Sequence, residues 1–211
     1  MIGYQLVIIW FVAFISLLWP IFGHFDLFDR LVGYWSTLMI LVAIWEFCLP
    51  FNFDLLSKKG AYYCENKCSF FSEKGKSIWD LFTPKMYMDL YADYSLADCK
   101  YRGKLGEDGF HFVMSGELLH GILIIFISIF TLYFLLFDKD SKYYPLAYFT
   151  LGLTNFELIA FYCFPQLCFE SFQEKHDNYY CKVWWLPYLY NVPWFVIGGL
   201  FAYKGATKLV E

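Results

Sequence analysis

The chain has 211 residues, of which 59% are hydrophobic, 24% are aromatic and only 17% are charged. A soluble domain carries roughly a quarter charged and about half apolar residues, so this composition disfavours a water-soluble domain and a disordered chain. The net charge is −4 and no basic stripe is present, which disfavours a nucleic-acid binder. No charged residue precedes Asp26. The sequence therefore predicts a polytopic membrane protein.

Five segments are long and apolar enough to cross a bilayer as helices. A spanning helix needs about 20 apolar residues, because each residue rises 1.5 Å across a hydrocarbon core roughly 30 Å thick. The predicted spans are residues 4–22, 31–50, 110–137, 143–164 and 183–203. The first has no basic start and no small-residue cleavage site, so we expect an anchor rather than a signal peptide. These spans predict an all-α integral membrane protein, a five-helix bundle that forms a single membrane domain over 1–211.

Two long polar loops, 51–109 and 165–182, would lie on one side of the membrane, together with the N-terminus. All seven cysteines lie in these loops or at the span ends that lead into them: Cys48, Cys64, Cys68, Cys99, Cys163, Cys168 and Cys181. Because disulfides persist in the lumen of the endoplasmic reticulum or outside the cell, we expect one or two disulfides and lumenal loops. Unpaired structural thiols are the alternative.

A zinc site is disfavoured, because the spacing of Cys64 and Cys68 has no matching pair elsewhere, so no metal is expected. The opposite side of the membrane has lysines in its short segments: Lys139, Lys142, Lys204 and Lys208. Positive residues in short segments mark the cytosolic side, which predicts a cytosolic C-terminus.

A stripe of mostly aromatic residues begins after Pro84 in the first long loop. Its members recur at three- and four-residue spacing and share one helical face: Tyr87, Leu90, Tyr91, Tyr94, Asp98 and Tyr101. Asp89 and Asp93 fall largely outside that face. Aromatic residues favour the membrane interface, so the pattern predicts an amphipathic interfacial helix before the third span.

Four ionisable residues fall at bilayer depth in the predicted spans: Glu46, Glu117, His120 and Glu157; His111, at the end of the third span, is expected at the interface. An ionisable group at this depth costs about 2.5–3.5 kcal/mol and usually faces the interior of the bundle. Glu117 and His120 lie three residues apart and share a face, as do Thr154 and Glu157. A carboxylate and an imidazole can exchange protons, which predicts acid/base chemistry. The competing interpretation is an interhelical hydrogen bond with a purely structural role.

The sequence resembles the emopamil-binding protein family, whose members share the EXPERA domain and include sterol Δ8–Δ7 isomerases. The family stretch Trp-Lys-Glu-Tyr-x-x-x-Asp-x-Arg-Tyr is matched by Tyr91–Tyr101, which reads Tyr-Ala-Asp-Tyr-Ser-Leu-Ala-Asp-Cys-Lys-Tyr. The family glutamates of the second and third spans match Glu46 and Glu117. One departure is Val42, which stands where the isomerases carry a histidine.

The resemblance implies a pocket for a sterol or a cationic amphiphile and an isomerisation that needs no cofactor. Glu46, Glu117 and His120 are the catalytic candidates. The ligand-binding candidates are Tyr94, Asp98, Tyr101, Thr154, Glu157, Asn191 and Trp194; the last two match the Asn-x-x-Trp of the final family span. A non-catalytic lipid-binding protein is an alternative, as is an accessory subunit of a larger membrane assembly. The expected partners are membrane lipids, with a homodimer or a host complex left open, and the expected location is the endoplasmic reticulum.

Overall fold

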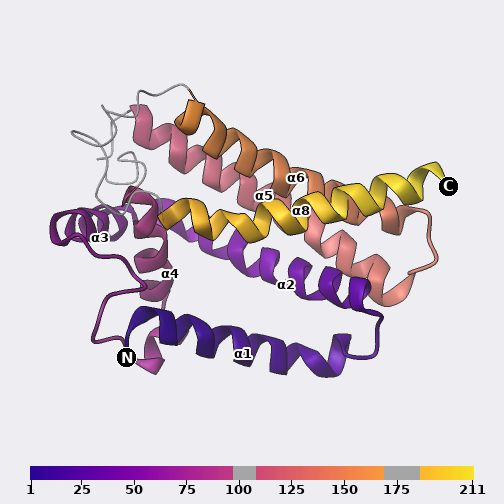
Figure 1. The fold of residues 1–211 in the computed structure, drawn as a ribbon, viewed down its shortest axis with the longest axis horizontal. Helices are drawn as coiled ribbons and strands as arrows, with labels where there is room; N and C mark the ends of the chain where they lie inside the picture. Colours follow the sequence, from indigo (N-terminus) through magenta and orange to yellow (C-terminus); the bar gives the residue numbers. More distant parts are fainter. Residues whose placement is uncertain (97–107, 169–185) are drawn as a thin grey trace. The chain divides into compact units, whose positions relative to one another are not determined.

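The structure, a computed structural model, describes residues 1–96, 108–168 and 186–211, and every regular element within these ranges is a helix (Figure 1). The elements in chain order are α1 (Gly3–Phe22), α2 (Leu27–Cys48), η1 (Leu49–Phe51), α3 (Phe53–Asn66), η2 (Ile78–Phe82), α4 (Pro84–Tyr91), η3 (Ala92–Leu96), α5 (Asp108–Phe137), α6 (Tyr143–Cys168) and α8 (Leu186–Val210). The all-α prediction is therefore confirmed for this part of the chain.

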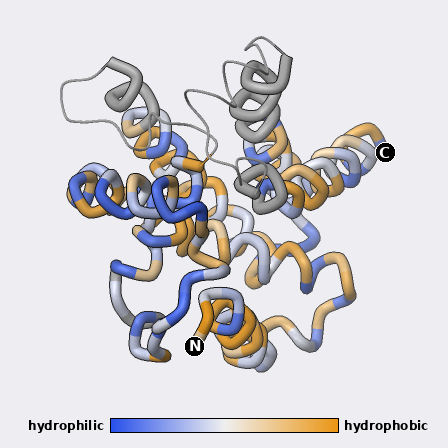
Figure 2. Tube along the Cα trace, turned by 60° about the vertical axis from the view of Figure 1, so that its left-hand side comes forward, coloured by the Kyte–Doolittle hydropathy of each residue, from blue (hydrophilic) through white to orange (hydrophobic). Residues whose placement is uncertain are grey.

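Three helices are long and apolar enough to cross a membrane. They cover Gly3–Phe22, Leu27–Phe51 and Met114–Phe137, which correspond to the first three predicted spans. Figure 2 shows that α1, next to the end marked N, is hydrophobic along most of its length. Helices α6 and α8 have 26 and 25 residues, and their crossing of the membrane stays a prediction.

The described residues form two compact units, which we treat separately. The first takes in the described parts of Met1–Phe14, Phe47–Leu118 and Glu170–Tyr190. The second takes in those of Ile15–Glu46, Leu119–Phe169 and Asn191–Glu211. Each unit is assembled from distant stretches of sequence, and the dividing points within the described residues fall inside helices. That residues 1–211 are a single domain stays a prediction.

In the second unit, small residues let α6 and α8 pack closely. A Cβ added at Gly152 would lie 2.5 Å from the carbonyl oxygen of Gly198, and one added at Gly198 would lie 2.9 Å from that of Gly152. Such small-residue contacts replace side-chain interdigitation where two apolar helices meet in a membrane. The two backbones therefore touch directly at this crossing.

A buried acid ties α2 to the start of α6 in the same unit. Asp29 is 3% exposed, accepts a hydrogen bond of 2.7 Å from the hydroxyl of Tyr144, and forms an ion pair with Lys139. The Asp29 carboxylate, mainly through its hydrogen bond, raises the pKa of Lys139. Sequence reasoning gave Asp29 no role, because it stands only at the edge of an apolar segment.

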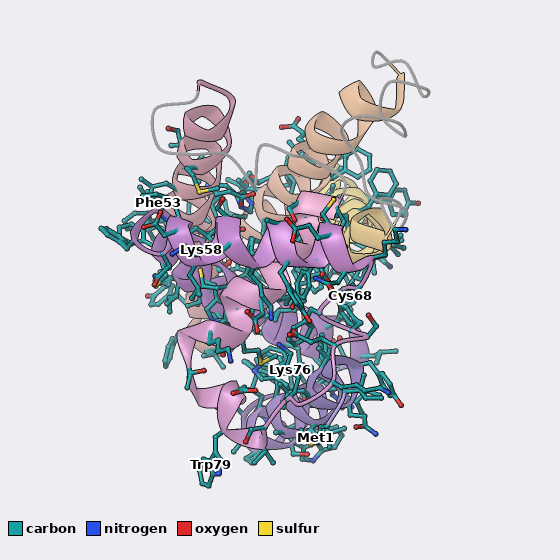
Figure 3. The ribbon with its side chains drawn as sticks, turned by 90° about the vertical axis from the view of Figure 1, so that its left-hand side faces the viewer. Met1, Phe53, Lys58, Cys68, Lys76 and Trp79 are labelled. Atoms are coloured by element: carbon teal, nitrogen blue, oxygen red, sulfur yellow. The ribbon has the colours of Figure 1, made fainter. Side chains whose placement is uncertain are left out.

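The first unit contains a network of buried and half-buried charges. Lys76 lies within hydrogen-bond distance of two carboxylates, 2.6 Å from Glu73 and 2.6 Å from Asp89. Glu73 also accepts from Lys59 at 2.5 Å and from the hydroxyl of Tyr63 at 2.8 Å. Figure 3 shows Lys76 among the side chains of this unit. Two lysines and two acids thus lie beside the apolar core of this unit, which includes Leu56 and Phe70.

The predicted interfacial helix begins at Pro84, as expected, but α4 ends at Tyr91 and continues as the 3-10 helix η3. The expected orientation is wrong for the acids: Asp89 is 2% exposed and Asp93 is fully buried. Asp89 pairs with Lys76, and Asp93 accepts a hydrogen bond of 2.8 Å from the backbone N–H of Phe70. These long-range partners bury two charges that the helical pattern places outside the stripe. The location of this segment at a membrane interface stays a prediction.

Candidate functional site

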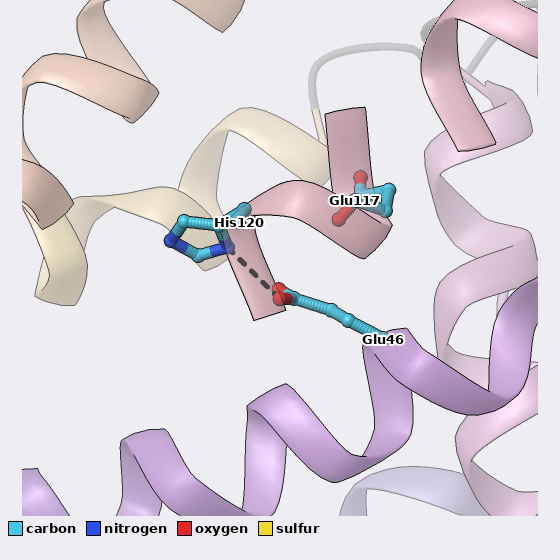
Figure 4. A group of neighbouring side chains, drawn as sticks. All are labelled: Glu46, Glu117 and His120. Atoms are coloured by element: carbon cyan, nitrogen blue, oxygen red, sulfur yellow. Dashed lines mark hydrogen bonds and ion pairs between the residues drawn. The ribbon is translucent and has the colours of Figure 1, made fainter. Parts of the chain in front are cut away.

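Glu46 and His120 form a buried pair in the second unit. Nδ1 of His120, on α5, lies 2.9 Å from Oε2 of Glu46, on α2 (Figure 4). The two residues are 5% and 4% exposed, respectively. Both were predicted as site residues from sequence, and the structure places them in direct hydrogen-bond contact.

Gly121 explains why α5 reaches Glu46. A Cβ added at this position would lie 3.1 Å from the carbonyl oxygen of Ala43 and 3.4 Å from the Cβ of Glu46. A larger residue would separate the two helices, so glycine permits the approach that brings His120 to the carboxylate. Sequence reasoning missed Gly121. The available signal was a glycine directly after a histidine in a stretch of bulky apolar residues.

The chemistry of the pair follows from its two groups and their surroundings. A buried carboxylate or imidazolium is costly alone, and a partner within hydrogen-bond distance offsets much of that cost. One proton shared between Glu46 and His120 can sit on either group, giving a neutral pair or an ion pair. The pair can therefore donate a proton to a substrate or accept one from it.

Glu117 lies three residues before His120 on α5 and is half-buried. One of its carboxylate oxygens lies within 4.8 Å of a ring nitrogen of His120. Figure 4 shows both side chains on the same helix. Glu117 belongs to the first unit, so within the second unit the pair supplies one carboxylate and one imidazole, which are donor types that divalent cations accept. Metal dependence is therefore a measurement to make on any activity of this site.

The remaining candidates of the second unit differ in their placement. Asn191 is buried, and the ring of Trp194 packs edge-on against that of Trp35, with centroids 5.3 Å apart. Thr154 donates its hydroxyl proton to the carbonyl oxygen of Thr150 in its own helix, at 2.8 Å. The side chain of Glu157 is exposed, so the structure does not place this carboxylate in the interior of the second unit.

The candidates from the first long loop are only partly described. Tyr94 is half-buried in the first unit, where its ring stacks on that of Tyr91 at 5.8 Å. Asp98 and Tyr101 lie outside the described residues. A ligand-binding role for these three residues stays a prediction.

Two cysteines, Cys48 and Cys68, are free thiols in the described part of the chain. Burial raises the pKa of the Cys68 thiol, and the charge of Glu73 adds to this effect, so Cys68 is a poor nucleophile at neutral pH. The expectation of one or two disulfides therefore concerns the other five cysteines, and it stays a prediction.

The chain was compared with family models, curated proteins and solved structures, and none of them matches it. The functional conclusion therefore depends on the site geometry and on the sequence resemblance.

Proposed function

We propose that this protein is a multi-pass membrane protein of the EXPERA type that isomerises a double bond in a sterol-like lipid. In this proposal five spans cross the membrane of the endoplasmic reticulum, the cysteine-bearing loops are lumenal, and the segment from Pro84 lies at the interface. The buried pair of Glu46 and His120 carries the acid/base chemistry.

One observation carries the proposal: a histidine contacts the buried glutamate of α2. The isomerases that the sequence resembles have this histidine on the second span, where Val42 stands here. Val42 is buried one helical turn before Glu46 and offers no ionisable group. His120 reaches the same carboxylate from α5 at 2.9 Å, so the acid/base partner is present on a different helix.

The proposed reaction is balanced in protons. One group of the pair donates a proton to one carbon of a ring double bond, which leaves a carbocation on the other carbon. A base then removes a proton from a carbon next to the cation, and the double bond re-forms one position along. An anionic carboxylate stabilises the cation electrostatically. We assign Glu46 and His120 to the proton transfers and Glu117 to the stabilisation of the cation.

The test incubates the purified protein in detergent with a Δ8-sterol in deuterated water. We expect a Δ7 product that carries one deuterium, detected by mass spectrometry, and a rate lowered at least 100-fold in Glu46→Gln, in line with loss of a proton-transfer group. Glu65→Gln makes the same chemical change at an exposed position and should leave the rate unchanged. Activity that disappears in EDTA would instead indicate a metal. No product from the folded wild type, or a Glu46→Gln rate equal to that of the wild type, would refute the proposal.

A second candidate is binding of a cationic amphiphile without catalysis, and a buried carboxylate favours it because a ligand cation could replace the proton of the pair. It predicts saturable binding of a steroidal tertiary amine, which weakens in Glu46→Gln and is absent for the uncharged carbon analogue. Binding without turnover of the Δ8-sterol selects this function over the isomerase.

A further inference from the structure

Several buried polar atoms in the second unit have no hydrogen-bond partner among the described residues, and we consider four of them that belong to uncharged side chains. They are Nε1 of Trp35, Oγ of Ser36, Oγ of Ser128 and Oδ1 of Asn155. Trp35 is 5% exposed and the other three residues are fully buried. Asn155 uses its amide nitrogen on the carbonyl oxygen of Leu151, 2.8 Å away, which leaves the acceptor unused. Buried polar atoms of this kind are costly, so these four require an explanation.

Three helices place Trp35 and Asn155 at the same level. The rings of Phe28, Tyr148 and Phe201 contact one another, with centroids 5.3 to 6.4 Å apart. Seven residues are close to two helical turns, so a step of seven keeps the same face and moves about 10.5 Å along the axis. That step leads from Phe28 to Trp35 on α2 and from Tyr148 to Asn155 on α6.

Helix α8 gives independent evidence that residues seven positions from the Phe28–Tyr148–Phe201 cluster lie at one level. Seven residues back from Phe201 on α8 stands Trp194, and its ring contacts Trp35 with a centroid distance of 5.3 Å. The α6–α8 crossing agrees as well, because a Cβ added at Gly198 would lie 3.3 Å from the Cβ of Asn155. Trp35 and Asn155 therefore share one layer of the helix bundle.

The two serines fall in the same layer by the same reasoning. Gly121 on α5 lies against Ala43 on α2, where an added Cβ would be 3.1 Å from the Ala43 carbonyl oxygen. Seven residues before Ala43 on α2 is Ser36, and seven residues after Gly121 on α5 is Ser128. The two helices run in opposite directions (Figure 1), so both steps lead the same way along the bundle. Ser36 adjoins Trp35 in the sequence, so the four residues lie at one level of the bundle, which we call the polar layer.

The chemistry of the polar layer selects its occupant. The layer offers an indole N–H donor, an amide oxygen acceptor and two hydroxyls that can do either. Its described residues carry no charge: Glu46 stands eleven residues from Trp35 along α2, about 16 Å away. Asp29 is already bonded to Tyr144 and Lys139, and Arg30 donates to the carbonyl oxygens of Gly23 and Phe25. A group that both donates and accepts, and is itself neutral, matches this set.

We propose that the polar layer of Trp35, Ser36, Ser128 and Asn155 is a binding site for a neutral hydroxyl group. The hydroxyl comes either from bound water or from an apolar alcohol whose body lies among the helices. The proposal uses neither Glu46 nor His120, so it stands or fails separately from the proposed isomerase. Glu46→Gln should leave hydroxyl binding unchanged.

The test follows the indole N–H of Trp35 by NMR in protein labelled with nitrogen-15 at its tryptophans, with Trp35→Phe identifying the signal. In ligand-free protein, a cross-peak between this N–H and long-lived water shows water as the occupant. In a titration, cholestanol should shift the signal at about tenfold lower concentration than its methyl ether, because the ether cannot donate a hydrogen bond. That preference shows an alcohol as the occupant.

Variants on α5 provide the matched control. Ser128→Ala should weaken the water cross-peak or remove the preference for the alcohol. Thr131→Val removes a hydroxyl that is equally buried on the same helix but is bonded to the Ile127 carbonyl oxygen at 2.8 Å, so it should change neither. Absence of both the water cross-peak and the alcohol preference in the wild type overturns the proposal. So does a Ser128→Ala variant that behaves like the wild type.

Discussion

Replacing Gly152 by alanine tests whether the contact between α6 and α8 holds the second unit together. The added Cβ would lie 2.5 Å from the carbonyl oxygen of Gly198 and 2.6 Å from the backbone nitrogen of Ala202. Ordinary contact begins near 3.4 Å, so the first approach is about 0.9 Å too short. Both obstructing atoms belong to the backbone, so no side-chain rotation relieves the clash and the helices must move apart.

Overpacking of this kind costs about 1–3 kcal/mol, and the rigid backbone atoms place Gly152→Ala at the upper end. For a chain of this length, about 2–3 kcal/mol corresponds to a fall in Tm of roughly 4–12 °C. The assay is thermal unfolding in detergent, followed by tryptophan fluorescence, since the chain has 8 tryptophans.

Gly199→Ala is the matched control; Gly199 lies on α8 directly after Gly198, the residue that Gly152 contacts. A Cβ there would meet only the ring of Phe156, at 3.6 Å, which is an ordinary contact. We expect its Tm to equal that of the wild type or to exceed it slightly, because alanine favours a helix over glycine by about 1 kcal/mol. Equal melting temperatures for Gly152→Ala and Gly199→Ala would refute the proposed helix contact.

Two further predictions concern buried charges. Burial alone would raise the pKa of Glu73, but hydrogen bonds from Lys59, Lys76 and Tyr63 outweigh burial and leave the pKa below its ordinary value of 4.5. Glu73 therefore stabilises the folded protein above about pH 4.5 and loses this effect as the pH falls through its lowered pKa. The decrease in Tm caused by Glu73→Gln should be largest at pH 7 and should become smaller below about pH 4.5. A decrease that becomes larger on acidification contradicts this prediction. Tyr144→Phe removes the hydrogen bond to buried Asp29 and should lower the free energy of unfolding by about 1–2 kcal/mol in denaturant titrations. The control Tyr143→Phe, at a residue that is 52% exposed, should change this free energy little. Equal effects of the two substitutions would contradict the role given to Tyr144.

Hydropathy was sufficient to predict the long helices. The predicted span 4–22 corresponds to α1 at Gly3–Phe22, and 110–137 corresponds to α5 at Asp108–Phe137. The length of an apolar segment is a property of the local sequence, so a single sequence is enough to recognise it. The pair Glu46–His120 was partly predictable for a different reason, since ionisable residues inside apolar spans favour interior positions.

Contacts between distant segments were not predictable in the same way. Asp89 and Asp93 belong to a helical pattern that placed them outside the aromatic stripe, yet both are buried by partners far away in the chain. In α6 the charged residue Glu157 was the natural candidate, but the structure buries Asn155 and exposes Glu157. Which face of a helix is covered depends on its neighbours, so the pattern of one helix alone did not identify its buried face.

The ion pairs of Lys139 affect how this end of the second unit meets a lipid surface. Lys139 lies between Asp26 and Asp29, so its charge is balanced within the folded protein. Lys142 then faces solvent beside two further acids, Asp138 and Asp140. Anionic headgroups attract clusters of uncompensated basic residues. This turn offers no such cluster, so we expect the apolar helices, rather than headgroup attraction, to hold it near the bilayer.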